Sequence, residues 1–150
     1  MAALSSDPHE MEERFSLLTE NTRVRVSSVL NRDCSHYGKK YMFDKNEDTC
    51  WNSDQGSPQF VILEFPEESC VREIHIQFQG GFVGKECCLE GGPSCNSLTP
   101  FFTFYPDDVG SLQIFPITSS RKLKVLKIVF ISSSDLFGRI TVYKLDVLGC

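Results

Sequence analysis

The stretch of the chain richest in residues that could bind or react is 41–56, which reads Y-M-F-D-K-N-E-D-T-C-W-N-S-D-Q-G. It holds the only tryptophan, Trp51, among turn-forming residues that include Asp44 and Thr49. Such residues bend the backbone tightly, and a large aromatic side chain beside them usually supplies buried area. We therefore predict a tight loop with inward-facing side-chain oxygens and a structural Trp51 whose indole ring lies in a core.

Nucleophiles and bases are present elsewhere, but their order does not match an enzyme. Ser27, Ser28, His75 and Asp107 do not form a nucleophile, base and orienting group that a sequence can reveal. His36 has no second histidine or acid at a metal-ligand spacing, so we interpret it as a surface residue. The sequence also lacks a glycine-rich phosphate loop and a paired-carboxylate motif. We predict a protein that is not an enzyme.

Composition narrows the class of protein further. The 150 residues fit one domain, and 12 Phe and 4 Tyr favour strands over helices. A net charge of −5 without a long basic run argues against direct binding of nucleic acid. No apolar run reaches the length that spans a bilayer, so we expect no membrane association.

Seven cysteines, an odd number, occur without a C-x-x-C pair, which argues against a zinc ribbon. Nothing at the start of the sequence resembles a secretory leader. Disulfides persist mainly in oxidising compartments. We therefore expect free thiols and a location in the nucleus and cytoplasm.

Residues 1–22 form an N-terminal extension that carries a helix signal. Asp7 can cap a helix and Pro8 suits its first position, while Met11, Phe15 and Leu18 recur at helical spacing. Isolated helices of this length are marginal in water. A short packed helix and a loosely docked tail are both compatible with this pattern.

Residues 23–150 read as one β domain. Strand patterns begin at Arg23 and recur at 59–65, 71–78, 87–89, 99–105, 112–117, 124–131 and 138–148. Pro66 is expected to end one of them, and the last should place Ile140, Val142 and Lys144 on one face. About eight short strands at even spacing predict an all-β antiparallel jelly-roll sandwich.

The segment 79–82 interrupts the strand pattern with Gly80 and Gly81, followed by Phe82. Glycines allow sharp backbone turns, and loop tips often carry binding residues. Phe82 either projects from the loop as a contact site or folds back onto the core.

Several motifs resemble the discoidin, or galactose-binding-like, family. They are F-D-K-N-E-D-T-C-W-N-S, V-I-L-E-F, V-R-E-I-H-I-Q-F and I-T-V-Y-K-L-D-V-L-G. More narrowly, V-S-S-V-L-N-R, Q-F-Q-G-G-F and L-F-G-R-I-T-V-Y look like a family of small proteins associated with an orphan nuclear receptor. That closer resemblance spans residues 24–149.

The broader resemblance implies a structural calcium in the predicted loop. By position its ligands would be the side chains of Asp44 and Thr49 and nearby carbonyls, including that of Glu47, and oxygen ligands suit this hard cation. The family's acidic residue on the last strand is replaced here by Lys144. Either calcium binds, or direct hydrogen bonds and a pair between Asp44 and Lys144 hold the loop.

The narrower resemblance implies a non-catalytic, monomeric module that binds an orphan nuclear receptor and represses its transcriptional activity. The sequence has no L-x-x-L-L motif of the kind that docks in an apolar groove, so we expect binding through loops. The candidate contact residues are Phe82, Phe137, Arg139 and Asn52. The alternative is a carbohydrate-binding module that uses Phe82, Trp51, Asn52 and Arg139, which rests on analogy of fold.

Overall fold

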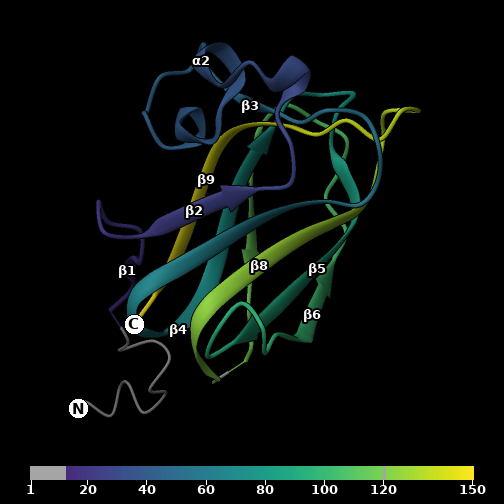
Figure 1. Cartoon of the computed structure of the whole chain (residues 1–150). Helices are drawn as coiled ribbons and strands as arrows, with labels where there is room; N and C mark the ends of the chain where they lie inside the picture. Colours follow the sequence, from purple (N-terminus) through teal and green to yellow (C-terminus); the bar gives the residue numbers. More distant parts are fainter. Residues whose placement is uncertain (1–12, 120) are drawn as a thin grey trace, which may run out of the picture.

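The computed structural model describes residues 13–119 and 121–150, whose main elements are nine antiparallel strands (Figure 1). The strands are β1 (Phe15–Ser16), β2 (Arg23–Val26), β3 (Trp51–Asn52), β4 (Gln59–Phe78), β5 (Gly84–Gly92), β6 (Thr99–Phe104), β7 (Leu112–Pro116), β8 (Lys122–Ser133) and β9 (Thr141–Gly149). The predicted antiparallel β fold is confirmed, with one strand more than expected. Asp7, Pro8 and Met11 of the predicted helix lie outside the described residues.

Strand β4 belongs to both layers of the sandwich. Its first half pairs with β2 and β8, and its second half pairs with β7 and β9. The prediction that Pro66 ends a strand is wrong, because the chain bends through Pro66 as one continuous strand with a shift in register. Residues 66–68 are exposed there, so the missing N–H of proline leaves no buried group unpaired.

The core lies between the two layers and is built from the inward-facing side chains of both. Trp51 is fully buried, as predicted, and its ring lies beside Phe130. Phe130 also meets Phe78 edge to face at a centroid separation of 5.8 Å. These aromatic contacts join β3, β4 and β8 across the centre of the sandwich.

Three short helical segments lie in the connection from β2 to β3, at the top of Figure 1. They are η2 (Leu30–Arg32), α2 (Cys34–Tyr37) and η3 (Lys39–Met42). The side chain of Asp33 caps α2 by accepting a hydrogen bond from the backbone N–H of His36. His36 is exposed, as predicted. Within the described residues, every helix is too short to cross a bilayer.

The described end of the N-terminal extension is extended chain. Phe15 pairs with Gly149 and Ser16 pairs with Leu148, so β1 adds to the edge of β9. The backbone N–H of Leu17 donates to Val147, and its side chain is buried in the core. Of the two alternatives for this segment, the packed helix does not form at Phe15 and Leu18, because the edge of β9 offers backbone partners that a helix cannot use.

A bulge in β9 changes which side chains face the core. Val142 pairs with Phe78 and Lys144 pairs with Gln77, so Tyr143 is an extra residue on the β9 side. Val142 and Leu145 both enter the core as a result. The prediction that Lys144 shares a face with Val142 is wrong, because the extra residue inverts the alternation.

A buried polar network under the loop after β3 centres on the Gln59 side chain. Its Oε1 accepts hydrogen bonds from the hydroxyls of Ser27 and Ser28, at 2.5 and 2.7 Å. Its Nε2 donates to the carbonyl oxygens of Asp54 and Gly56, at 3.1 and 2.8 Å. The residue thus ties the loop to β4 and to the chain after β2.

We expect Gln59→Leu to lower the free energy of unfolding by about 3 kcal/mol, because it removes several hydrogen bonds and leaves the half-buried hydroxyls of Ser27 and Ser28 without their acceptor. Urea denaturation measures this loss. Gln55→Ala is the control, since the exposed Gln55 side chain makes no described hydrogen bond, and it should change stability by less than about 0.5 kcal/mol. Equal stability of Gln59→Leu and wild type would show that the network does not hold the loop.

Candidate functional site

Three loops meet at the end of the sandwich opposite the C-terminus, and together they form what we call the loop end: 53–58, 79–83 and 134–140 (Figure 1). Backbone hydrogen bonds join them: Gly56 N–H donates to Phe137, and Ser134 N–H donates to Val83. Gly138 has φ 85°, and a side-chain carbon there would lie 2.7 Å from the carbonyl oxygen of Gly56. This close approach requires glycine and fixes the third loop against the first.

The Arg139 cluster, defined as Phe82, Asp135, Phe137 and Arg139, occupies the loop end. The Arg139 guanidinium lies over the rings of Phe82 and Phe137, with centroid distances of 5.1 and 5.9 Å. Three of the four predicted contact residues therefore come together from two loops. Phe82 is half-buried against the guanidinium, an arrangement between the two alternatives of projection and burial.

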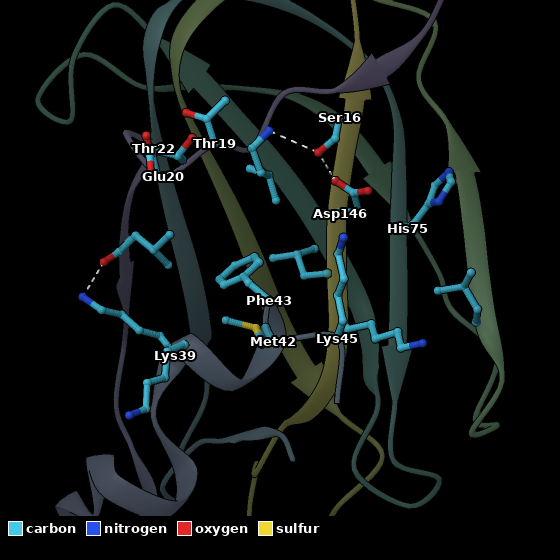
Figure 2. Close-up of a pocket in the computed structure, with 16 residues that line it drawn as sticks. Ser16, Thr19, Glu20, Thr22, Lys39, Met42, Phe43, Lys45, His75 and Asp146 are labelled. Carbon is cyan, nitrogen blue, oxygen red and sulfur yellow. Dashed lines mark hydrogen bonds between the residues drawn. The ribbon is translucent and has the colours of Figure 1, made fainter. Parts of the chain in front are cut away.

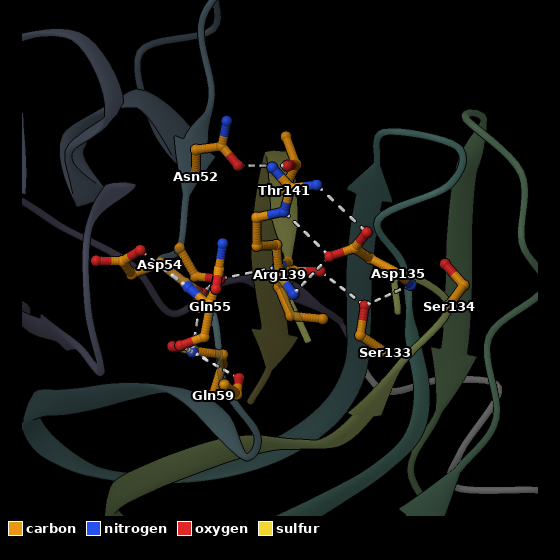
Figure 3. Close-up of polar contacts among 12 residues, drawn as sticks. Asn52, Asp54, Gln55, Gln59, Ser133, Ser134, Asp135, Arg139 and Thr141 are labelled. Carbon is orange, nitrogen blue, oxygen red and sulfur yellow. Dashed lines mark hydrogen bonds and ion pairs between the residues drawn. The ribbon is translucent and has the colours of Figure 1, made fainter. Parts of the chain in front are cut away.

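Asp135 fixes the orientation of Arg139 (Figure 3). Its Oδ2 accepts from Nε of Arg139 at 3.0 Å, and its Oδ1 accepts from Nη2 at 3.4 Å. The hydroxyl of Ser133 donates to the backbone oxygen of Arg139, which closes the turn. The hydrogen bond from Arg139 holds the pKa of the Asp135 carboxyl below its ordinary value. The pair is therefore charged at neutral pH.

The tip of the third loop is apolar and open to solvent. Leu136 is 90% exposed and Phe137 is 55% exposed. Exposed apolar side chains next to an arginine and aromatic rings match the composition of energetic centres in protein interfaces. The loop end can therefore supply apolar contact area around an oriented cation, and this arrangement supports binding.

Asn52 lies next to the cluster, and no described hydrogen bond joins its side chain to the four cluster residues. Its Oδ1 accepts a 2.6 Å hydrogen bond from the hydroxyl of Thr141 (Figure 3). The backbone N–H of Thr141 donates to the carbonyl oxygen of Phe82. The sequence reasoning missed Asp135 and Thr141. Asp135 precedes Arg139 by four residues in a serine-rich turn, which is a detectable signal for an ion pair.

The loop predicted to hold calcium is closed by direct hydrogen bonds. Oδ2 of Asp44 accepts from the Thr49 hydroxyl at 2.6 Å, and its Oδ1 accepts from the N–H of Asn46 at 3.0 Å. The Glu47 side chain is exposed and has no described partner. Across residues 13–119 and 121–150, acidic, histidine and cysteine side chains nowhere gather in groups of three that could hold a metal ion.

Calcium takes six to eight oxygen ligands, so a site in this loop would need backbone carbonyl oxygens in addition to the side chains of Asp44 and Thr49. The expected pair between Asp44 and Lys144 is absent from the described ion pairs. The assignment of Asp44, Glu47 and Thr49 to calcium stays a prediction that binding must test.

We expect Asp135→Asn to lower the melting temperature at neutral pH, because it removes the charge that holds Arg139. Since the pKa of Asp135 is lowered in the folded protein, its contribution is present above the ordinary carboxylate pKa. It is lost as the pH falls through the lowered value, so the difference from wild type should shrink in acid. Calorimetry across this range measures it.

Asp48→Asn is the control for this titration, because the exposed Asp48 side chain has no described partner. Its melting temperature should follow that of wild type at every pH. A difference between Asp135→Asn and wild type that persists unchanged into acid would contradict the role given to the ion pair.

We also expect the melting temperature to be the same in calcium and in chelator, because hydrogen bonds already occupy the Asp44 carboxylate. Differential scanning calorimetry of the wild-type chain decides this, since a cation that binds only the native state must raise stability. Asp44→Ala shows whether any calcium effect comes from this loop. A rise that Asp44→Ala abolishes would establish the calcium site.

Several sequences are closely similar to this chain. It is 57% identical over 134 residues to a nuclear receptor 2C2-associated protein of Danio rerio, covering 89% of this chain and 95% of that one. The corresponding proteins of Xenopus laevis and Homo sapiens are 52% and 49% identical over the same length, covering 89% of this chain and 98% and 96% of theirs. No family model matches the sequence.

Solved structures establish the fold. A module described as CpGH89CBM32-5 from Clostridium perfringens, in complex with GalNAc-β-1,3-galactose, has a TM-score of 0.75 at 19% identity and covers 89% of this chain and 99% of its own. An F5/8 type C domain from Bacteroides fragilis has a TM-score of 0.78 at 10% identity, covering 91% and 96%. The fold is therefore the galactose-binding-like jelly roll that the sequence motifs predicted.

At identities below 20%, the solved structures show the similarity of fold alone. The related sequences are about half identical to this chain, and the matches span nearly the whole length of this chain and of each relative. The chain belongs to the family of nuclear receptor 2C2-associated proteins.

Proposed function

We propose that this chain is a non-catalytic module that binds an orphan nuclear receptor and represses its transcriptional activity. The observation that carries the proposal is the identity of about half of all residues with relatives named for association with nuclear receptor 2C2. The proposal requires the chain to reach the nucleus as well as the cytoplasm.

The loop end is the surface that we assign to the receptor. Leu136 and Phe137 offer exposed apolar area, and Arg139 is oriented before binding by Asp135. A partner that buries this tip therefore loses little side-chain freedom on the arginine, and pre-organisation of this kind favours affinity. Arginine and aromatic side chains are also enriched among residues that dominate binding energy.

The carbohydrate-binding alternative lacks comparable support. The argument for it is the similarity of fold, and proteins that share this fold can have many different functions. The Arg139 guanidinium, which a sugar-binding site would use to contact hydroxyl groups, already donates to Asp135. The indole of Trp51, the other aromatic group considered for sugar stacking, is buried.

We expect Phe137→Ala to weaken binding to purified receptor about 30-fold, the effect of truncating an energetically dominant side chain. Phe82→Ala should weaken it in the same direction, because the Arg139 guanidinium then loses one of its aromatic neighbours. Calorimetric titration gives the affinities. A receptor-driven reporter in cells should show repression by wild type and its loss with Phe137→Ala.

Phe15→Ala is the matched control. Phe15 is 56% exposed, like Phe137, but it lies beside Gly149 at the opposite end of β9. Its removal should leave receptor affinity unchanged. Absence of binding by wild type would overturn the proposed function, whereas full binding by both Phe82→Ala and Phe137→Ala would move the contact to another surface.

A further inference from the structure

A groove of about 950 Å³ lies on the side of the sandwich, between the chain before β2, the segment η3 and strand β9 (Figure 2). Its lining shares no residue with the loop end. The apolar part of its lining comes from Leu18, Val24, Met42, Phe43, Leu112 and Leu145. This lining is apolar enough to hold hydrophobic side chains of a ligand.

Four lysines line the same groove: Lys39, Lys40, Lys45 and Lys144. The acidic residues in the lining are Glu20 and Asp146. Asp146 accepts a 2.6 Å hydrogen bond from the Ser16 hydroxyl (Figure 2). It also accepts one from the N–H of Val147. Cations therefore outnumber anions here, although the whole chain has a net charge of −5.

Two of these lysines have no partner within the described residues. Lys39 donates to the backbone oxygen of Val24 and Lys40 lies over the ring of Tyr41, but Lys45 and Lys144 make no described polar contact. Lys144 reaches the groove because the bulge at Tyr143 removes it from the core face. Lys45 follows the core-packed Phe43 by two residues. Unpaired lysines beside apolar side chains offer electrostatic complementarity to an acidic ligand.

We propose that this groove binds an acidic amphipathic segment of a protein partner. Apolar side chains of the segment would lie on the half-buried Leu18, Val24 and Phe43, while its carboxylates face Lys45 and Lys144. An amphipathic helix presents such residues at a spacing of three or four, and binding in an apolar groove is a common mode of peptide recognition.

The observations favour a peptide over a phosphate polymer or a membrane. Nucleic acid recognition needs many phosphate contacts, and Glu20 and Asp146 interrupt the basic lining. Proteins bind lipid surfaces through apolar and basic side chains that project from the molecule, whereas the apolar and basic side chains described here line a groove. An acidic amphipathic peptide has both kinds of group that this groove can bind: apolar side chains for the apolar lining, and carboxylates for the lysines.

The probe is a fluorescent helical peptide with leucine at every third or fourth position, glutamate beside the leucines and alanine elsewhere, measured by anisotropy against the full chain. We expect wild type to bind it and the double variant Lys45→Glu/Lys144→Glu to bind it about tenfold more weakly, because like charges then meet across the groove. A peptide with lysine in place of glutamate should not bind. The probe contains no receptor sequence, so its result is independent of the proposed function.

Lys85→Glu is compared with each single variant, Lys45→Glu and Lys144→Glu, so that the change in net charge is the same; Lys85 is an exposed β5 residue without a described partner. Lys85→Glu should bind the peptide like wild type. Equal weakening by Lys85→Glu, equal binding of both peptides, or no effect of the double variant would overturn the proposal.

A third arm tests the chain's own acidic N-terminus as the occupant, by neutralising it with Asp7→Asn, Glu10→Gln and Glu12→Gln in the full chain. Peptide binding that appears only in that variant would assign the groove to residues 1–12 and overturn the partner assignment. Equal binding by this variant and wild type supports the partner.

Discussion

The structure depends on the pairing of one long strand, β4, with partners in both layers. Its first half is hydrogen-bonded to β8 and its second half to β9, so the two layers are segments of one continuous sheet. The bend at 66–68 is exposed, and the residues on either side of it are buried. Because every other strand joins this sheet directly or through a neighbour, the positions of the loops at both ends follow from the course of β4.

The loop end combines rigid backbone with exposed apolar side chains. Gln59 ties the first loop to β4 from inside, and hydrogen bonds between loops position the third loop against the first. Leu136 and Phe137 can therefore remain in water without a buried partner of their own, because backbone contacts fix the turn that carries them. A surface built in this way is held in shape before a partner arrives.

The sequence predicted the class of fold and the burial of Trp51, and both are confirmed because strand periodicity and turn residues are local signals. Three of the predicted contact residues lie together in the Arg139 cluster, and their binding to a partner stays a prediction. Asp135 was missed although its spacing of four residues from Arg139 is a signal for an ion pair, because that spacing forms a pair only where the turn brings the two side chains together. The position of Lys144 was wrong for a different reason: a bulge inverts the alternation, and only the pairing of β9 with β4 reveals it. The groove lining, drawn from distant segments, has no local signature either.

The extra residue at Tyr143 changes the inward and outward alternation of side chains between the first and second halves of β9. Before it, Thr141 ties the strand to the loop that carries Phe82; after it, Lys144 and Asp146 line the groove while Leu145 still packs in the core. A strictly alternating strand would fix both surfaces by a single register. Here the inserted residue puts Val142 in the core before it and Leu145 in the core after it, so the bulge decides which side chains of β9 line the groove.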